Sequence, residues 1–267
     1  MPLNSRRPPQ TVLITGASSG IGRALALAYA APGSRLILIG RNAERLAATA
    51  QKAMDQGAEV IIGAIDVRDQ AAMAAWISER DKTHPIDLAI ANAGITTGLS
   101  PGELTEDPQA VRAILATNLL GVLNTIEPLI QPMSARGKGQ IACIGSIAGL
   151  HGLPYAPAYC MTKSAVHAYM ESIRGRLEAR GLVVSLIIPG FVKTPLNDSI
   201  DALKPLEISD SKAAALIRRG LERGKAIIAF PLPLYWLARF GRLLPPRLYD
   251  RIMAGVAAQV PQTQERV

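Results

Sequence analysis

The first 190 residues alternate between short apolar runs and longer, alanine-rich amphipathic stretches. The runs are aliphatic or β-branched over most of their length, which is typical of strands buried on both faces of a parallel sheet. The stretches between them have the length of helices. The expected strands are residues 11–15, 35–39, 59–65, 86–91, 140–144 and 182–188, and the expected helices are residues 21–31, 44–56, 70–82, 108–136 and 158–180.

This order of elements predicts a doubly wound α/β fold. Strands and helices that alternate at this spacing indicate βαβ units with right-handed crossovers. A further helix at 213–223 and strand at 225–230 bring the expectation to a parallel sheet of about seven strands with helices on both faces. No repeat or linker divides the chain, so we expect one Rossmann-like domain over residues 1–267.

The last part of the chain departs from this alternation. Residues 193–212 are polar and are expected to form a mobile substrate lid loop with short helices. Residues 231–267 form an extension that mixes apolar residues with arginines. The apolar run at 226–237 leads into this extension and is shorter than the about 20 residues that span a bilayer. A flap over the pocket or a subunit contact is the preferred interpretation of the extension. Peripheral contact with an anionic membrane is the alternative.

Composition narrows the function classes. The net charge is +8, and residues 200–267, with eleven basic and six acidic side chains, contribute +5 of it. No nucleic-acid motif accompanies this charge, so no nucleic-acid partner is expected. Cys143 and Cys160 form neither a disulfide framework nor a metal-ligand cluster, so we expect a reducing compartment and no metal. Residues 1–10 lack the apolar run of a signal peptide, and we expect a cytoplasmic protein, with a peripheral membrane location as the alternative.

A glycine-rich segment, residues 15–22, follows the first expected strand. Between a strand and a helix, Gly16 permits a tight turn, Gly20 allows a pyrophosphate to approach the backbone, and Gly22 allows the helix to pack on the strand. The N–H groups at the helix N-terminus suit phosphate groups. The segment therefore predicts a dinucleotide site, with contacts at Gly16, Ser18, Ser19, Gly20, Ile21 and Gly22.

The end of the second expected strand distinguishes the two nicotinamide dinucleotides. An acidic residue there would bind the ribose 2′-hydroxyl, whereas this chain has Gly40 and Arg41. The planar guanidinium of Arg41 can pair with a 2′-phosphate, and Ser18 can add a hydroxyl. We therefore expect NADP(H) in preference to NAD(H).

Later strand ends supply the remaining expected cofactor contacts. Asp66 can reach the adenine amino group, and Asn92 can tie adjacent strands together, although each could simply be a turn residue. Residues after the sixth expected strand can hold the nicotinamide carboxamide. These contacts are Asp66, Val67, Asn92, Ala93, Gly94, Pro189, Gly190, Val192 and Thr194.

Four residues have the features of a proton-transfer site. Tyr159 and Lys163 are four positions apart at the start of an expected helix, so they share a face. An ammonium favours the phenolate, so the pair makes a workable general acid/base although a free phenol has a pKa of about 10. Ser146 can hold the substrate oxygen. Asn118 interrupts an apolar run. It is either a satisfied core amide or, through an ordered water that bridges it to Lys163, part of a proton path.

These motifs resemble the short-chain dehydrogenase/reductase family over roughly residues 11–195. The resemblance implies a catalytic tetrad with Tyr159 as acid/base, Lys163 lowering its pKa and holding ribose hydroxyls, and Ser146 positioning the carbonyl. It also implies a homodimer or homotetramer built from the helices at 108–136 and 158–180. The features that carry the resemblance are the glycine loop, Asn92-Ala93-Gly94, Asn118, Ser146, Tyr159 with Lys163, and Pro189-Gly190 with Thr194.

The substrate side points to a lipophilic molecule. The chain lacks the Val-Asp-Gly-Gly run that closes the family's fatty-acid-synthesis reductases, and its end looks like that of members with lipophilic substrates. Apolar side chains dominate the expected pocket. His151 could contact the substrate, but a histidine of a surface loop is the preferred interpretation. We expect hydride transfer between NADP(H) and a carbonyl or secondary alcohol. A regulatory NADP(H)-binding protein without turnover and a membrane-surface lipid-modifying reductase are the alternatives. The expected substrate contacts are Ser146, His151, Leu153, Phe191 and Leu196.

Overall fold

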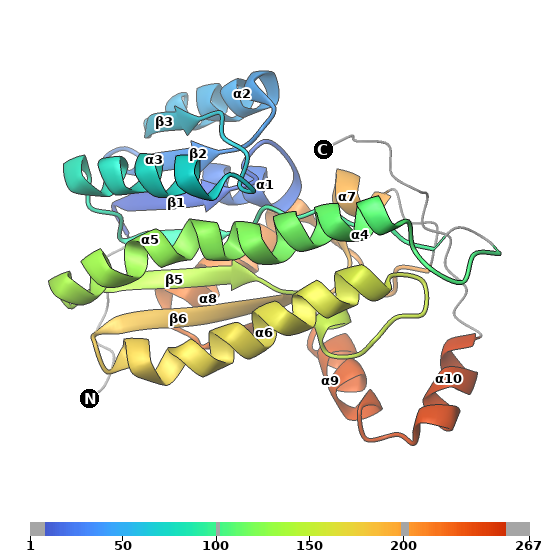
Figure 1. Ribbon diagram of the computed structural model, residues 1–267. Helices are drawn as coiled ribbons and strands as arrows, with labels where there is room; N and C mark the ends of the chain where they lie inside the picture. Colours follow the sequence, from blue (N-terminus) through green and yellow to red (C-terminus); the bar gives the residue numbers. More distant parts are fainter. Residues whose placement is uncertain (1–8, 100–101, 199–202, 255–267) are drawn as a thin grey trace.

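A parallel sheet forms the centre of the computed structural model, which describes residues 9–99, 102–198 and 203–254 (Figure 1). Within these residues, seven strands lie in the order β3-β2-β1-β4-β5-β6-β9, and the expected fold class is confirmed. The strands are β1 (Thr11–Thr15), β2 (Arg35–Ile39), β3 (Glu59–Gly63), β4 (Leu88–Ala91), β5 (Gly139–Ile144), β6 (Leu182–Pro189) and β9 (Ile227–Phe230).

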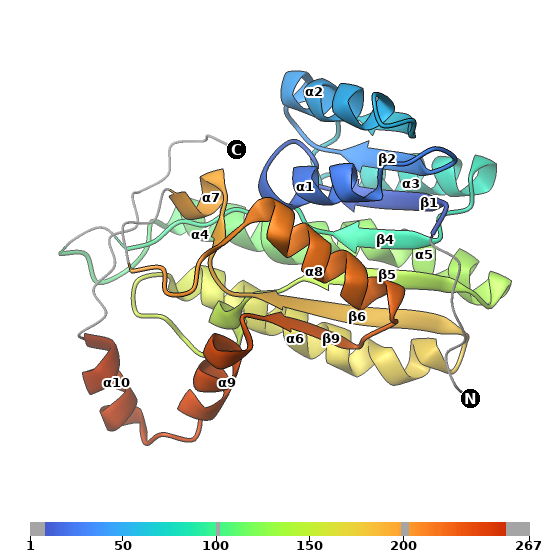
Figure 2. The ribbon, with the colours of Figure 1, turned by 180° about the vertical axis from the view of Figure 1, so that it is seen from behind.

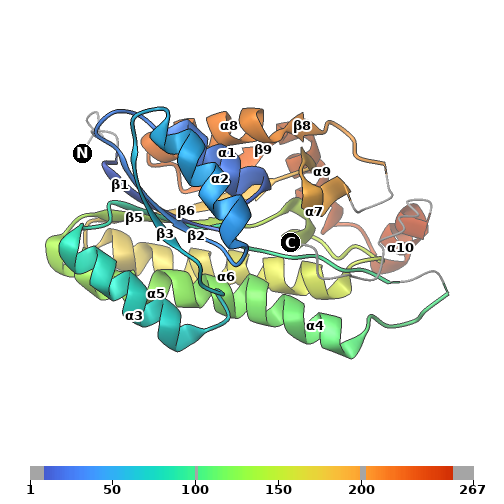
Figure 3. The same ribbon diagram turned by 90° about the horizontal axis from the view of Figure 1, so that it is seen from above.

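Two helical layers cover the sheet, as the view from above shows (Figure 3). Neighbouring residues of one strand point into different layers: Val12 and Ile14 join the core on one face, and Leu13 joins the core on the other. Burial on both faces is the reason that the strands are apolar throughout. One layer holds α1 (Gly20–Tyr29), α2 (Ala43–Met54) and α8 (Asp210–Glu222), and the other holds α3 (Gln70–Thr83), α5 (Gly121–Arg136) and α6 (Pro157–Glu178).

The strand order reverses between β1 and β4. From β1 the chain runs outward to β2 and β3, and it then returns to the other side of β1 as β4. Loops at the carboxyl ends of these two strands diverge, which leaves the crevice where ligands bind in doubly wound sheets. The topology therefore directs attention to the segments after β1, β4, β5 and β6.

The expected single helix at 108–136 was wrong in one respect. It consists of α4 (Pro108–Leu115), a π-helical turn (Ala116–Leu120) and α5, because the turn takes up one additional residue and re-aims the side chains within it. Asn118 lies in this turn. The whole run is long and apolar enough to cross a membrane, but half of its most apolar window is buried in the fold, as in a core helix.

The expected lid at 193–212 contains a short helix, as expected, and also two short strands. It contains β7 (Val192–Lys193), α7 (Pro195–Asp198) and β8 (Ile208–Ser209), and β7 pairs with β8 in a small parallel sheet. The last residues of the expected lid belong to α8, because Ser209 accepts a hydrogen bond from the Lys212 N–H and caps that helix. Residues 199–202 lie outside the described residues.

The C-terminal extension forms two helices. α9 (Leu232–Gly241) and α10 (Pro246–Ala254) follow β9 and stand out from the sheet beside the first turns of α6 (Figures 1 and 2). The expected extension continues to residue 267, and its residues 255–267 lie outside the described part of the chain.

Candidate active site

A cavity opens at the carboxyl ends of β1, β4, β5 and β6. We call the part formed by residues 16–21 and 40–42 the glycine-loop end, and the part around Ser146 and Tyr159 the tyrosine end. The cavity brings most of the predicted site residues together. It is lined by Gly16, Ser18, Ser19, Gly20, Ile21, Arg41, Val67, Asn92, Ala93, Gly94, Ser146, Leu153, Tyr159, Lys163, Pro189, Gly190, Phe191, Val192, Thr194 and Leu196, while Gly22, Asp66, Asn118 and His151 lie outside its lining.

Close backbone packing builds the glycine-loop end. Gly16 has φ +67°, and a Cβ there would lie 2.8 Å from the Ala93 Cα. A Cβ on Gly22 would lie 2.3 Å from the Gly16 carbonyl oxygen. Asn92 Nδ2 donates to the Thr15 carbonyl oxygen at 2.9 Å, so the tie between β1 and β4 that the sequence indicated is present. Gly22 thus lies outside the cavity lining, and its missing side chain allows α1 to pack closely against the loop.

The N-terminus of α1 faces this end of the cavity without a side-chain cap. Its N-cap residue, Ser19, makes no side-chain hydrogen bond to the helix within the described structure, whereas Asn42 and Asp69 cap α2 and α3. An uncapped helix start presents N–H groups and a positive dipole end. This arrangement fits the pyrophosphate of a dinucleotide, which would supply the missing acceptors.

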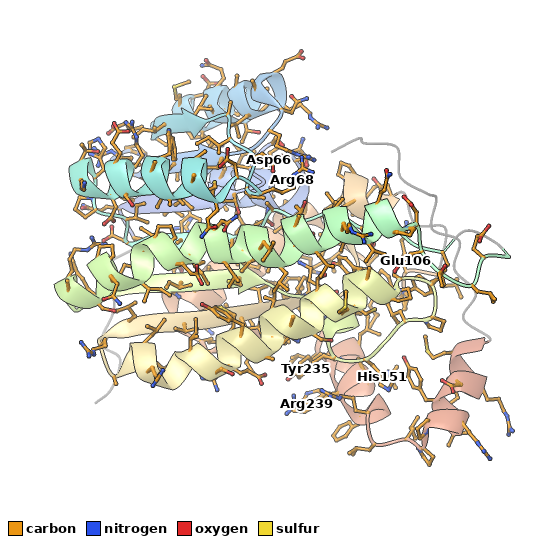
Figure 4. The ribbon with its side chains drawn as sticks, in the orientation of Figure 1. Asp66, Arg68, Glu106, His151, Tyr235 and Arg239 are labelled. Carbon is orange, nitrogen blue, oxygen red and sulfur yellow. The ribbon has the colours of Figure 1, made fainter. Side chains whose placement is uncertain are left out.

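Three charged side chains lie beside the glycine-loop end. Asp66 accepts hydrogen bonds from Arg68 at 2.6 and 2.9 Å (Figure 4). Arg41 Nη1 lies 3.8 Å from the same carboxylate. Burial alone would raise the pKa of Asp66, but the hydrogen bonds from Arg68 and the charge of Arg41 hold this pKa below its usual range. Arg68 was missed in the sequence, because one arginine after a turn carries no motif.

Asn118 is fully buried behind the cavity wall. Its Oδ1 accepts from the Ile95 N–H and its Nδ2 donates to the Ile95 carbonyl oxygen, both at 2.8 Å. A Cβ on Gly94 would lie 3.3 Å from Asn118 Oδ1 and 3.7 Å from Lys163 Nζ, so the glycine separates the two groups. The satisfied core amide is the observed arrangement. The water bridge from Asn118 to Lys163 stays a prediction.

Ser146 and Tyr159 meet at the tyrosine end. Ser146 Oγ accepts from the Ala148 N–H at 3.1 Å, which fixes the side chain at the start of a 3₁₀ turn (Ile147–Gly149). Burial raises the pKa of Tyr159 to about 12, although a hydrogen bond from Ser146 partly offsets this effect. Tyr159 is therefore protonated at neutral pH.

Lys163 is buried one turn after Tyr159. Its Nζ donates to the Ile144 carbonyl oxygen at 2.8 Å and lies 5.6 Å from the centre of the Tyr159 ring. Burial lowers the pKa of Lys163 to about 8. Burial disfavours the charged forms of both side chains and sets the direction of both pKa shifts. The lowering of the Tyr159 pKa by Lys163 stays a prediction.

His167 supports this end and was missed in the sequence. It is buried, and its Nε2 accepts from the Ser146 N–H at 3.3 Å. Burial and then the charge of Lys163 lower the pKa of His167 to about 4. The imidazole is therefore neutral and holds the backbone of Ser146. The spacing of Lys163 and His167, four positions apart on α6, was the available signal.

Glu106 was also missed. It precedes α4, reaches the start of α6 (Figure 4) and accepts a hydrogen bond from the Ala158 N–H at 2.7 Å. Its Oε1 has no partner within the described residues, and burial raises the pKa of the carboxyl group. Glu106 thus caps the helix whose first turn carries Tyr159. No local pattern signals this contact, because the two segments are 52 positions apart.

Apolar side chains surround the tyrosine end. Leu153, Phe191 and Leu196 line the cavity as expected, and Tyr155 adds an aromatic wall that sequence reasoning missed. His151, an expected substrate contact, lies outside the lining. It is half-buried, and its ring stacks on Tyr249 of α10 with a distance of 3.5 Å between the ring centres. Further missed lining residues are Asn42, Ile65, Thr117, Ile144, Gly145, Ile147, Ala148, Ala156, Pro195 and Asn197.

Comparisons with known proteins agree with this geometry. The family model for short chain dehydrogenases matches residues 10–204. An uncharacterized oxidoreductase of Myxococcus xanthus is 34% identical over 90% of this chain and 95% of its own length. A short-chain dehydrogenase from Sphingobium yanoikuyae in complex with NADPH has a TM-score of 0.75 at 25% identity, over 96% of this chain and 99% of that chain.

A further solved structure carries the other dinucleotide. A 3-oxoacyl-acyl-carrier-protein reductase from Brucella melitensis with bound NAD has a TM-score of 0.71 at 26% identity, over 86% of this chain and 91% of that chain. Both similar structures thus contain a nicotinamide cofactor, but only the NADPH of the first carries a 2′-phosphate. The chain belongs to the short-chain dehydrogenase/reductase family and is an oxidoreductase that acts on a carbonyl or alcohol with a nicotinamide cofactor.

Proposed function

We propose that the enzyme transfers hydride between NADP(H) and the carbonyl or secondary alcohol of a lipophilic small molecule. The observation that carries this proposal is the single cavity that joins Arg41 at one end to Ser146 and Tyr159 at the other. A bound nicotinamide cofactor supplies or accepts the hydride there. The residues of the chain bind, orient and exchange the proton.

Tyr159 is the proposed proton donor in the reductive direction. Its raised pKa keeps the phenol protonated until negative charge develops on a substrate oxygen beside it. Ser146 hydrogen bonds to the same oxygen and orients it. Lys163, which at neutral pH is still largely protonated, stabilises the phenolate that the donation leaves and holds ribose hydroxyls.

The preference for NADP(H) rests on charge. Arg68 neutralises Asp66 through its hydrogen bonds, so the carboxylate does not cancel the positive charge of Arg41. Arg41 lines the cavity where the second strand ends. A 2′-phosphate placed there gains a charge-assisted contact that a 2′-hydroxyl cannot make.

The lipophilic substrate class rests on the walls of the tyrosine end. Leu153, Phe191 and Leu196 give the cavity apolar walls beside Ser146 and Tyr159. Because burial of apolar surface contributes about 25 cal/mol per Å², such walls favour a hydrocarbon-rich ketone over a sugar.

Fluorescence titration with NADPH and NADH tests the cofactor, and a screen of lipophilic ketones for loss of NADPH absorbance tests the reaction. Tighter binding of NADPH with turnover supports the proposal. Binding without turnover on any carbonyl or alcohol favours a regulatory NADP(H)-binding protein. Absence of binding rejects the site at the glycine-loop end.

We also propose a homodimer or homotetramer with α5 and α6 at the contact. Leu120, just before α5, and Met161 on α6 are half exposed, which is unusual for large apolar side chains on core helices. Light scattering on the eluted protein measures the mass. A monomer at micromolar concentration would reject this assembly.

A further inference from the structure

The C-terminal helices expose a large apolar surface. Six side chains of α9, α10 and the connection between them carry it: Trp236, Leu237, Phe240, Leu243, Leu248 and Ile252. We call these six residues the C-terminal surface. Leu237 is 69% and Leu243 79% exposed, and so many exposed large apolar side chains on one short segment are unusual for a soluble monomer.

α9 is apolar on two faces. Tyr235 and Ala238 pack into the core, and Leu234 lies near Gly190, so this side fixes the helix to the sheet. Trp236, Leu237 and Phe240 occupy the opposite side and remain exposed. A helix with apolar side chains on opposite sides normally buries both sides. The exposed side of α9 therefore needs an apolar environment outside the fold.

α10 continues this arrangement. Leu248 and Ile252, four positions apart, share one side of the helix, whereas Arg247 and Arg251 share another. Arg239 and Arg242 are exposed near the end of α9, and Figure 4 shows the side chain of Arg239 pointing away from the sheet. Residues 231–254 contain four arginines and one acidic residue, Asp250. An apolar surface is thus bordered by positive charge.

α10 is attached to the edge of the cavity. Tyr249 stacks on His151 and donates a hydrogen bond to the Gly152 carbonyl oxygen at 2.7 Å. The next residue, Leu153, lines the cavity. The C-terminal surface and the tyrosine end are therefore fixed relative to each other.

We propose that the C-terminal surface docks on an anionic lipid membrane. Exposed apolar and aromatic side chains enter the headgroup region, and the bordering arginines pair with lipid phosphates. A second copy of the chain fits less well, because a two-fold contact would place the same arginine-rich patch against itself. The four arginines are complementary to an anionic surface, and each one near that surface is worth about fivefold in binding.

Docking gives a lipophilic substrate a short path from the bilayer to the tyrosine end. This consequence rests on the proposed function, whereas docking itself does not. Vesicle binding is measured without cofactor or substrate, so its failure would leave the proposed reaction untouched. Failure of turnover would likewise leave docking untouched.

Co-sedimentation with vesicles tests the proposal. We expect the full-length protein to bind vesicles that contain phosphatidylserine, to bind phosphatidylcholine vesicles much more weakly, and to be released by salt. Leu237→Glu with Phe240→Glu should abolish binding, and Arg239→Gln with Arg251→Gln should weaken it about 25-fold. Leu104→Glu is the matched control, since Leu104 is 95% exposed and lies before α4. Binding that is equal in all variants would overturn the proposal.

Trp236 provides a readout of insertion. Brominated lipids should quench its fluorescence, and a Trp236→Phe variant removes the quenched part while Trp76 on α3 remains. Sedimentation velocity on the Leu237→Glu, Phe240→Glu protein tests whether a second copy of the chain covers the C-terminal surface instead. Dissociation of an oligomer without loss of vesicle binding would assign the C-terminal surface to a subunit contact and overturn membrane docking. Retained turnover and thermal stability show that the variant is folded.

Discussion

The two ends of the cavity are built from different chemical groups of the chain. The glycine-loop end consists mainly of backbone: Gly16 and Gly22 allow segments to approach closely, and α1 offers its uncapped N–H groups. At the tyrosine end, buried polar side chains are held in place: Ser146 Oγ accepts a hydrogen bond within its own 3₁₀ turn, and Lys163 donates one to Ile144 of β5.

Because of this difference, the two ends tolerate different substitutions. At the glycine-loop end a Cβ added to Gly16 or Gly22 collides with backbone, and Arg41 is the side chain on which the cofactor preference depends. At the tyrosine end a removed polar group leaves its buried partner without a hydrogen bond, which costs about 1–3 kcal/mol for each orphaned group. Each end therefore has its own kind of sensitive variant.

Tyr159→Phe should have the largest effect. The substitution removes the hydroxyl that exchanges the proton, and loss of a general acid lowers kcat by about 10²–10⁴-fold. Binding of NADPH should change by less than about twofold, because the glycine-loop end is untouched. Steady-state kinetics and cofactor fluorescence measure the two quantities. Near-normal kcat would remove Tyr159 from the reaction.

His167 should make the stability of the tyrosine end depend on pH. Its pKa falls from 6.5 to about 4 on folding, so the neutral imidazole contributes stability above about pH 6.5 that is lost as the pH falls through about 4. Protonation would turn the acceptor of the Ser146 N–H into a donor. The shift corresponds to about 3 kcal/mol at most.

Urea unfolding of the wild type and of His167→Gln between pH 7 and pH 4 measures this contribution. The difference in the free energy of unfolding should shrink as the pH falls, because the other titrating groups are common to both proteins. A difference that stays constant over this range would contradict the role of the neutral imidazole.

Arg41→Asp should reverse the preference at the glycine-loop end. The new carboxylate repels a 2′-phosphate and can accept a hydrogen bond from a 2′-hydroxyl, so the NADP/NAD ratio of kcat/KM should fall about 100-fold. Arg45→Asp is the control, because it introduces the same charge on the exposed side of α2. An equal ratio in wild type and Arg41→Asp would reject the assignment.

Gly22→Ala should destabilise the protein by about 1–3 kcal/mol, since its Cβ would lie 2.3 Å from the Gly16 carbonyl oxygen and force the loop to shift. Gly152→Ala is the matched control, because no atom lies within 4 Å of a Cβ at that position. Thermal unfolding with and without NADPH measures both variants. Equal melting temperatures would show that the loop does not depend on close backbone packing.

Local sequence patterns were sufficient for the glycine-loop end and for the sheet. Strands that are apolar throughout, glycines between a strand and a helix, and a four-residue spacing of Tyr159 and Lys163 are signals that lie within a few residues of one another. They identified the fold class and most of the residues that line the cavity. Short-range geometry fixes these features, so the sequence by itself determined them.

Only the tertiary structure decided what depends on partners distant in the chain. Contacts between separate elements decide that Glu106 caps the start of α6 and that Arg68 donates hydrogen bonds to Asp66. Burial decides that the pKa of Tyr159 is raised. The π-helical turn around Asn118 and the exposed side of α9 likewise follow from how helices pack. An apolar residue in a sequence shows that burial is favourable, but only the packed fold shows which apolar residues remain exposed.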